Sequence, residues 1–138
     1  VEVCESLARV LLQKIRQRTV SSHGRDFTEA FHTFESIRQL MEERFLEFKT
    51  VEDVAAESGV SPVYLSRLFK RFAGSGAYRF LLRLRMNYAA ELLLEDRLKV
   101  RAVANRLHYA DAFQFSRAFK RVYGVPPSAL TSGTEKNR

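Results

Sequence analysis

Two six-residue segments carry the side chains of this chain that are best suited to bind a polyanion. Residues 66–71 read SRLFKR and residues 116–121 read SRAFKR, so five of the six positions are identical at a spacing of 50 residues. An arginine can donate two hydrogen bonds to O6 and N7 of a guanine, and lysine and serine side chains can bind phosphate oxygens. The pattern therefore indicates nucleic-acid recognition through two copies of one element.

The two segments belong to a longer internal repeat. Matching apolar residues precede them, which are Val51, Val54 and Ala55 in the first copy and Val100, Val103 and Ala104 in the second. Each copy has the outline of a helix, a short turn and a second helix, which is a helix-turn-helix. Ser61, with Pro62 after it, and Asp111 are the expected N-caps of the two second helices.

Each predicted second helix has two distinct faces. Apolar residues recur at i, i+3, i+4 and i+7 and predict a core-facing stripe, made of Leu65, Leu68, Phe69 and Phe72 in one copy and Phe115, Ala118, Phe119 and Val122 in the other. The opposite faces carry small, hydroxyl-bearing, cationic and a few apolar residues, which are Val63, Ser66, Arg67 and Lys70, and then Ala112, Phe113, Ser116, Arg117 and Lys120. Neither opposite face has an acid after the cap. Because phosphate repels acids, these faces suit the major groove of DNA.

The charge distribution agrees with this interpretation. Residues 1–49 hold eight Lys or Arg and eight Asp or Glu, whereas residues 50–138 hold fifteen and eight, so the net charge of +7 belongs to the repeat region. A basic balance alone is compatible with a merely soluble surface, but the repeat favours a nucleic-acid partner. The hydrophobic content of 46% indicates a folded chain, and no apolar run approaches the roughly 20 residues of a membrane span.

The remaining segments predict further helices. An apolar stripe over residues 2–19 and a second one over residues 28–48 surround a break at residues 21–26, and the part from Glu35 is expected to pack on the first helix-turn-helix. The first stripe has three interpretations, which are a helix lying on the core, a linker and a dimer seam.

Residues 77–95 predict a joining helix about 28 Å long. A rigid helix of that size can place two reading helices one DNA turn, about 34 Å, apart.

The chain resembles the AraC/XylS family of bacterial transcription regulators over about residues 37–130. The resemblance rests on Val54-Ala55, on Gly59-Val60-Ser61, on residues 64–70, on Arg85, Ala89 and Leu92-Leu93, and on residues 115–117, 119–121, 124–125 and 127. It implies an all-α, seven-helix unit with two helix-turn-helix subdomains joined by a long helix and preceded by one or two N-terminal helices. The expected bounds are 1–34 for a helical linker or the end of a regulatory region, 35–131 for the DNA-binding domain and 132–138 for a frayed tail. Within the domain, the subdomains are expected at about 50–74 and 99–124.

The resemblance also implies roles for single residues. The base-reading positions of the family correspond to Val63, Ser66, Arg67, Ala112, Phe113, Ser116 and Arg117, and the expected phosphate contacts are Lys70, Arg71, Lys120 and Arg121. The chain departs from the family pattern at three places. His108 stands where glycine is usual, Gly76 replaces a hydroxyl cap, and Leu130-Thr131 replaces an aromatic-arginine ending.

Each of these roles has an alternative. Arg67 and Arg117 are candidates for guanine readout, but a phosphate clamp or an intramolecular ion pair explains an arginine equally well. Ser66 and Ser116 reach DNA or simply face solvent. Val63 and Phe113 are apolar enough to touch thymine methyl groups, but Phe113 can instead fold into the core beside Tyr109.

The expected function is a sequence-specific double-stranded DNA-binding transcription regulator, with activation and contact to RNA polymerase favoured. The alternatives are non-specific DNA binding and a protein-interaction module. Some DNA-repair methyltransferases carry a similar module but need a zinc-held cysteine cluster, and Cys4 is the single cysteine here. His23, His32 and His108 lack metal-ligand spacing, so no cofactor, metal or enzymatic activity is expected. We also expect a cytoplasmic location and, through the N-terminal region or a missing regulatory domain, homodimerisation.

Overall fold

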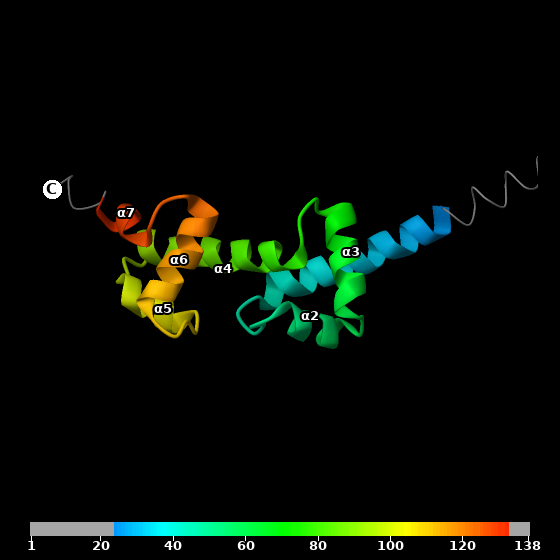
Figure 1. Cartoon of the computed structure of the whole chain (residues 1–138), viewed down its shortest axis with the longest axis horizontal. Coiled ribbons are helices and arrows are strands. Elements are labelled where there is room, and N and C mark those ends of the chain that lie inside the picture. Colours follow the sequence, from blue (N-terminus) through cyan, green and yellow to red (C-terminus); the bar gives the residue numbers. More distant parts are fainter. Residues whose placement is uncertain (1–23, 133–138) are drawn as a thin grey trace, which may run out of the picture.

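The computed structural model describes residues 24–132, and every regular element in that range is a helix. A helix over residues 24–44 comes first, and α2 to α7 follow it along the chain (Figure 1). The all-α fold and the paired helix-turn-helix arrangement expected from the sequence are confirmed. The predicted helical stripe over residues 2–19 and the tail lie outside the described residues, apart from Ser132.

The first helix-turn-helix consists of α2 (Val51–Ser58) and α3 (Pro62–Phe72). A capping box starts α2, in which the Thr50 hydroxyl accepts a bond from the Asp53 amide and the Asp53 carboxylate accepts one from the Thr50 amide. Hydrogen bonding from Thr50, with its backbone amide as the largest contributor, and to a smaller extent from Lys49 lowers the pKa of the Asp53 carboxyl. Gly59 ends α2 in the left-handed conformation, and Ser61 caps α3 as predicted.

The second helix-turn-helix consists of α5 (Val100–Arg106) and α6 (Ala112–Tyr123). Lys99 stands at the N-cap of α5 and gives it no side-chain cap, whereas Asp111 caps α6 as predicted. His108 takes the left-handed conformation with φ 60°, close to the 68° of Gly59 in the first turn. The turn therefore needs a positive φ, and histidine is among the residues besides glycine that tolerate it. A short α7 (Pro127–Ser132) follows and packs on α4 and α6.

The joining helix α4 (Ala77–Leu94) contributes to two separate cores. Ala77 and Leu81 lie in the first core with Leu65, Leu68 and Phe69 of α3, and further along α4 Leu82, Met86, Ala89, Leu92 and Leu93 lie in the second core with Phe115 and Phe119 of α6. Its 18 residues span about 27 Å at the helical rise. Figure 1 shows α4 running from the first helix-turn-helix, where it begins near α3, to the second, where α5, α6 and α7 lie around its far end. The predicted core faces of α3 and α6 are confirmed, with Phe72, Ala118 and Val122 half-buried at their margins.

The helix over residues 24–44 packs on the first subdomain over more of its length than the sequence predicted. Phe34 meets the ring of Phe69 edge-on at 5.1 Å, and the earlier Phe27 and Phe31 both lie 5.4 Å from Phe72. The expected packing of the part from Glu35 is confirmed by Ile37 and Met41, which lie in the first core, and the packing extends further upstream than expected. The apolar period of this helix places Phe27, Phe31 and Phe34 on the same side as the later core residues.

Candidate nucleic-acid interface

The predicted reading face of α3 points to solvent. Val63, Ser66, Arg67 and Lys70 are all exposed, and Val63 keeps 62% of its surface accessible although it is apolar. The buried residues of α3 lie on the other face, so the hydrophobic core fixes which side chains point outward. No acidic residue occurs between Pro62 and Phe72, and the exposed face is therefore cationic.

The corresponding face of α6 is exposed in the same way, with one difference in size. Phe113 occupies the place of Val63 and has an exposed fraction of 69%, so it does not fold into the core beside Tyr109. The guanidinium carbon of Arg117 lies 5.7 Å from the centre of the Phe113 ring, one helical turn away. Ala112 and Ser116 are half-buried, whereas Lys120 and Arg121 are exposed.

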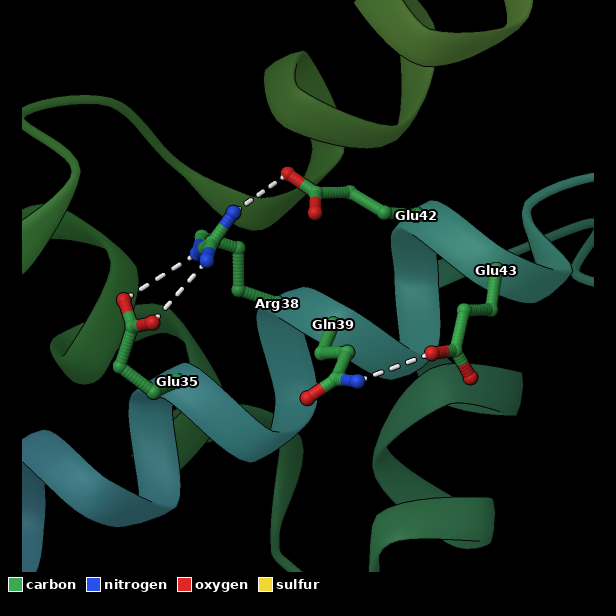
Figure 2. Close-up of polar contacts among 5 residues, drawn as sticks. All are labelled: Glu35, Arg38, Gln39, Glu42 and Glu43. Atoms are coloured by element: carbon green, nitrogen blue, oxygen red, sulfur yellow. Dashed lines mark hydrogen bonds and ion pairs between the residues drawn. The ribbon is translucent and has the colours of Figure 1, made fainter.

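Intramolecular ion pairs do not account for the arginines of the two reading faces. In the part of the chain that the structure describes, ion pairs join Arg38 and Arg44 to glutamates, and neither Arg67 nor Arg117 forms one. Figure 2 shows the contrast on the helix over residues 24–44, where Arg38 lies between Glu35 and Glu42. A hydrogen bond from Arg38 lowers the pKa of the Glu35 carboxyl, and this effect outweighs the rise that desolvation causes. The cations of α3 and α6 thus have no carboxylate partner among residues 24–132, unlike Arg38.

One predicted phosphate contact has a specific neighbour inside the protein. The guanidinium carbon of Arg71 lies 5.1 Å from the ring centres of both Phe27 and Phe72, so its charge rests on aromatic faces at the C-terminal end of α3. Arg71 is still exposed, so this contact leaves donors available. This contact is not predictable from a local pattern, because Phe27 lies 44 residues upstream of Arg71.

The two reading helices have similar placements on α4. In Figure 1, α3 stands beside the start of α4 and α6 crosses α4 nearer its other end, and in that view both helices run from the lower edge, where α2 and α5 lie, toward the upper edge. Both N-terminal ends therefore point in the same direction in that view. Tyr123 supports the placement of α6, since its hydroxyl donates a 2.6 Å hydrogen bond to Asn87 Oδ1 on α4.

Arg85, at the middle of α4, is a functional candidate that sequence reasoning noted without assigning it a role. It is 9% exposed and is the one buried charged residue in the described range. Its Nη1 donates a 3.0 Å bond to the Phe48 carbonyl, and its Nη2 donates to the Leu107 carbonyl. Arg85 lies four residues after Leu81 and four before Ala89, which places it on the apolar stripe of α4. This position predicts a buried arginine.

Two other kinds of feature, a metal-binding cluster and a membrane-spanning helix, are absent from the described residues. Residues 24–132 contain no group of three His, Cys, Asp or Glu side chains that could hold a metal ion, and Cys4 and His23 lie outside that range. His32 and His108 are exposed. Of the helices in the same range, none is both long and apolar enough to cross a membrane.

Comparison with known proteins identifies the same region. A family model described as a helix-turn-helix domain matches residues 54–132. The HTH-type transcriptional regulator YidL of Escherichia coli is 36% identical over 88 residues, which are 64% of this chain and 30% of that protein. The raffinose operon transcriptional regulatory protein RafR of Pediococcus pentosaceus is 37% identical over 79 residues, or 57% and 28% of the two chains. The chain thus spans about a third or less of the relatives it matches.

Solved structures extend the similarity to the fold. The C-terminal domain of AraT, a response regulator from Geobacillus stearothermophilus, superposes with a TM-score of 0.67 at 37% identity, covering 73% of this chain and 84% of that one. The DNA-binding domain of AdpA, solved in complex with a target DNA, superposes with a TM-score of 0.66 at 25% identity, covering 76% and 95%. Taken with the paired helix-turn-helix architecture, these matches show that the chain belongs to the AraC/XylS family of transcription regulators.

Proposed function

We propose that this chain is the DNA-binding part of a sequence-specific transcription activator that reads two adjacent major-groove segments of one duplex. The observation that carries the proposal is the pair of exposed cationic faces, on α3 and α6, that have no acid of their own and lie at the two ends of one stiff helix. The AdpA domain, which has a similar fold, was solved with its target DNA. The proposed base contacts are Val63, Ser66, Arg67, Ala112, Phe113, Ser116 and Arg117.

The proposed division of labour follows from position along each helix. Residues at the N-terminal half of a helix inserted in the major groove lie nearest the base edges, and residues nearer its end lie beside the backbone. Arg67 and Arg117 are placed to form the two-bond contact with guanine, which contributes about 1–3 kcal/mol of discrimination. Lys70, Arg71, Lys120 and Arg121 bind phosphates and contribute affinity that depends on salt rather than on sequence.

The finer points of the proposal concern the parent protein. Activation would require contact with RNA polymerase, and homodimerisation would involve the N-terminal region or a regulatory domain outside this sequence. We also propose that the protein acts in the cytoplasm, on the nucleoid. These points rest on the family and on no particular residue of the described range.

A competition experiment tests the proposal against non-specific DNA binding and against a protein-interaction module. Duplexes bound by the chain are selected from a random pool, and the selected duplex then competes with random duplex at fixed salt. A sequence-specific reader prefers the selected duplex by about 10³-fold or more. A preference of only a few fold would support non-specific DNA coating, and the absence of binding to any duplex would support a protein-interaction module.

A further inference from the structure

We infer that Arg85 is a positioning residue that fixes the two helix-turn-helix subdomains relative to each other and thereby sets the spacing of the DNA segments they read. The inference rests on the proposed function, because spacing has meaning only for a two-segment reader. It goes further in naming the side chain that determines the spacing. Arg85 is not among the residues proposed to contact bases or phosphates.

The two carbonyl oxygens that Arg85 binds belong to different subdomains. Phe48 lies in the loop before α2 and belongs to the first core, whereas Leu107 ends α5 and belongs to the second core. The guanidinium group thus joins the backbone of one half to the backbone of the other through a single planar group. Its donors have a fixed geometry, so two bonds from one guanidinium restrict both the distance and the angle between the acceptors.

The charge of Arg85 makes these bonds costly to lose. Arg85 forms no ion pair with any of the residues that the structure describes, so backbone carbonyls and a ring face compensate its burial. Leu107 is the C-cap of α5, where the carbonyls carry partial negative charge that favours a cation. The guanidinium carbon also lies 5.6 Å from the Tyr109 ring, and Tyr109 meets the ring of Phe115 in α6 at 5.6 Å.

Few other contacts fix the orientation of one half relative to the other. The helix pairs with extensive contacts lie within one half or include α4, so α4 is the main connection between the halves. A straight helix fixes the distance between its ends, whereas the rotation of each half about the helix depends on side-chain contacts such as those of Arg85. A cleft of about 270 Å³ lies beside Arg85, and it is lined by Lys49 of the first half, by His108 and Tyr109 of the second, and by residues of α4. Residues of both subdomains face it, and they leave room for relative movement once Arg85 is removed.

The test measures how binding depends on the distance between the two recognised blocks. Duplexes carry the blocks selected by the wild-type chain with zero, one or two base pairs added or removed between them. Each base pair shifts one block by about 3.4 Å and rotates it by roughly 35°. For the full 138-residue wild-type chain, we expect at least a tenfold loss of affinity when the first base pair is added or removed. Arg85→Met keeps a side chain of similar length but has no hydrogen-bond donors. For this variant we expect weaker binding at the best spacing, and less than a threefold further loss of affinity when one base pair is added or removed.

Two further variants keep the test decisive. Met41→Ala removes a buried side chain of the N-terminal helix from the first core, away from the cleft, so it is expected to lower the melting temperature while the spacing profile stays sharp. Arg85→Lys retains the charge with one nitrogen in place of the fork, and it is expected to broaden the profile partly. It also replaces Arg85→Met if that variant does not fold. A folded Arg85 variant with the wild-type profile, or an equal loss of affinity at every spacing, would overturn the inference. A wild-type chain that selects no two-block site would instead overturn the proposed function.

Discussion

The two helix-turn-helix halves present similar reading faces on different supports. In the first half a capping box starts α2, Gly59 forms the turn, and the helix over residues 24–44 covers α3 with phenylalanine rings. In the second half α5 begins without a side-chain cap, His108 forms the turn, and the short α7 provides the additional packing. The comparison shows that the exposed cationic face is repeated in the sequence, whereas the contacts that hold it in place are not.

The halves also differ in one exposed side chain. Val63 on α3 and Phe113 on α6 are equivalent in the repeat, and both are more than 60% exposed. Phe113 lies against Arg117, whereas Arg67 has no aromatic contact among the described residues. Because a phenyl ring offers more apolar surface and orients its neighbouring guanidinium, we expect the second half to read a thymine next to a guanine more strictly.

The largest expected effect comes from removing the support that only the first half has. Phe34 is 4% exposed and contacts Phe69 and Phe72, so Phe34→Ala leaves a cavity between the N-terminal helix and α3. We expect the free energy of unfolding to fall by about 3–5 kcal/mol. Urea denaturation measures this change. Phe31→Ala, at a site that is 41% exposed, is the control and should cost clearly less. A loss below about 1 kcal/mol for Phe34→Ala would mean that the helix does not stabilise the first half.

The next effect concerns the exposed apolar side chains of the reading faces. Phe113→Ala is expected to weaken binding to the selected duplex by about 1–3 kcal/mol, which is the usual cost of one mismatched base pair. The melting temperature should not change, because the ring contributes little to the core. Val63→Ala is the matched variant in the first half and should weaken binding less. A drop of several degrees in the melting temperature of Phe113→Ala would show that the ring packs inward in solution.

A smaller effect distinguishes the starts of α2 and α5. Thr50→Ala removes the side-chain bond to the Asp53 amide and should lower stability by about 1 kcal/mol. Lys99→Thr introduces a capping hydroxyl at the equivalent place in the second half and should raise stability by a similar amount. Thermal denaturation measures the change in stability of each variant. Effects of equal sign would contradict the difference in capping.

The smallest effect concerns the turns. His108 holds a φ of 60° that a glycine adopts without strain, so His108→Gly is expected to raise stability by about 0.5–1 kcal/mol. The gain is limited because glycine loses more conformational entropy on folding. Gly59→His is the reciprocal variant and should lower stability, as chemical denaturation can measure. If His108→Gly is destabilising, the imidazole makes a contact in solution that outweighs the backbone strain.

The sequence predicted the features that depend on local patterns. The apolar period of α3 and α6 predicted which faces are buried, and Ser61 and Asp111 predicted where these helices start. The joining helix was expected at 77–95 and is observed at Ala77–Leu94. The roles of the exposed reading residues and the domain bounds remain predictions, since exposure alone does not show what a side chain contacts.

Other features depend on contacts between distant residues and were not predictable in the same way. Phe27 reaches Phe72 across 45 positions, and Arg85 joins carbonyls that lie 37 and 22 residues away from it. A repeat or a helical period says nothing about such distances, because each describes residues a few positions apart. Only the place of Arg85 on an apolar stripe gave a local sign that its charge is buried.

The most direct measurement of the central claim compares the duplexes selected from a random pool by the wild-type chain, by Arg67→Ala and by Arg117→Ala. We predict that the wild-type chain selects two short blocks about one DNA turn apart, and that each variant loses base preference in one block and keeps it in the other. A single uninterrupted block, or unchanged preferences in both variants, would contradict the claim that α3 and α6 read the duplex separately.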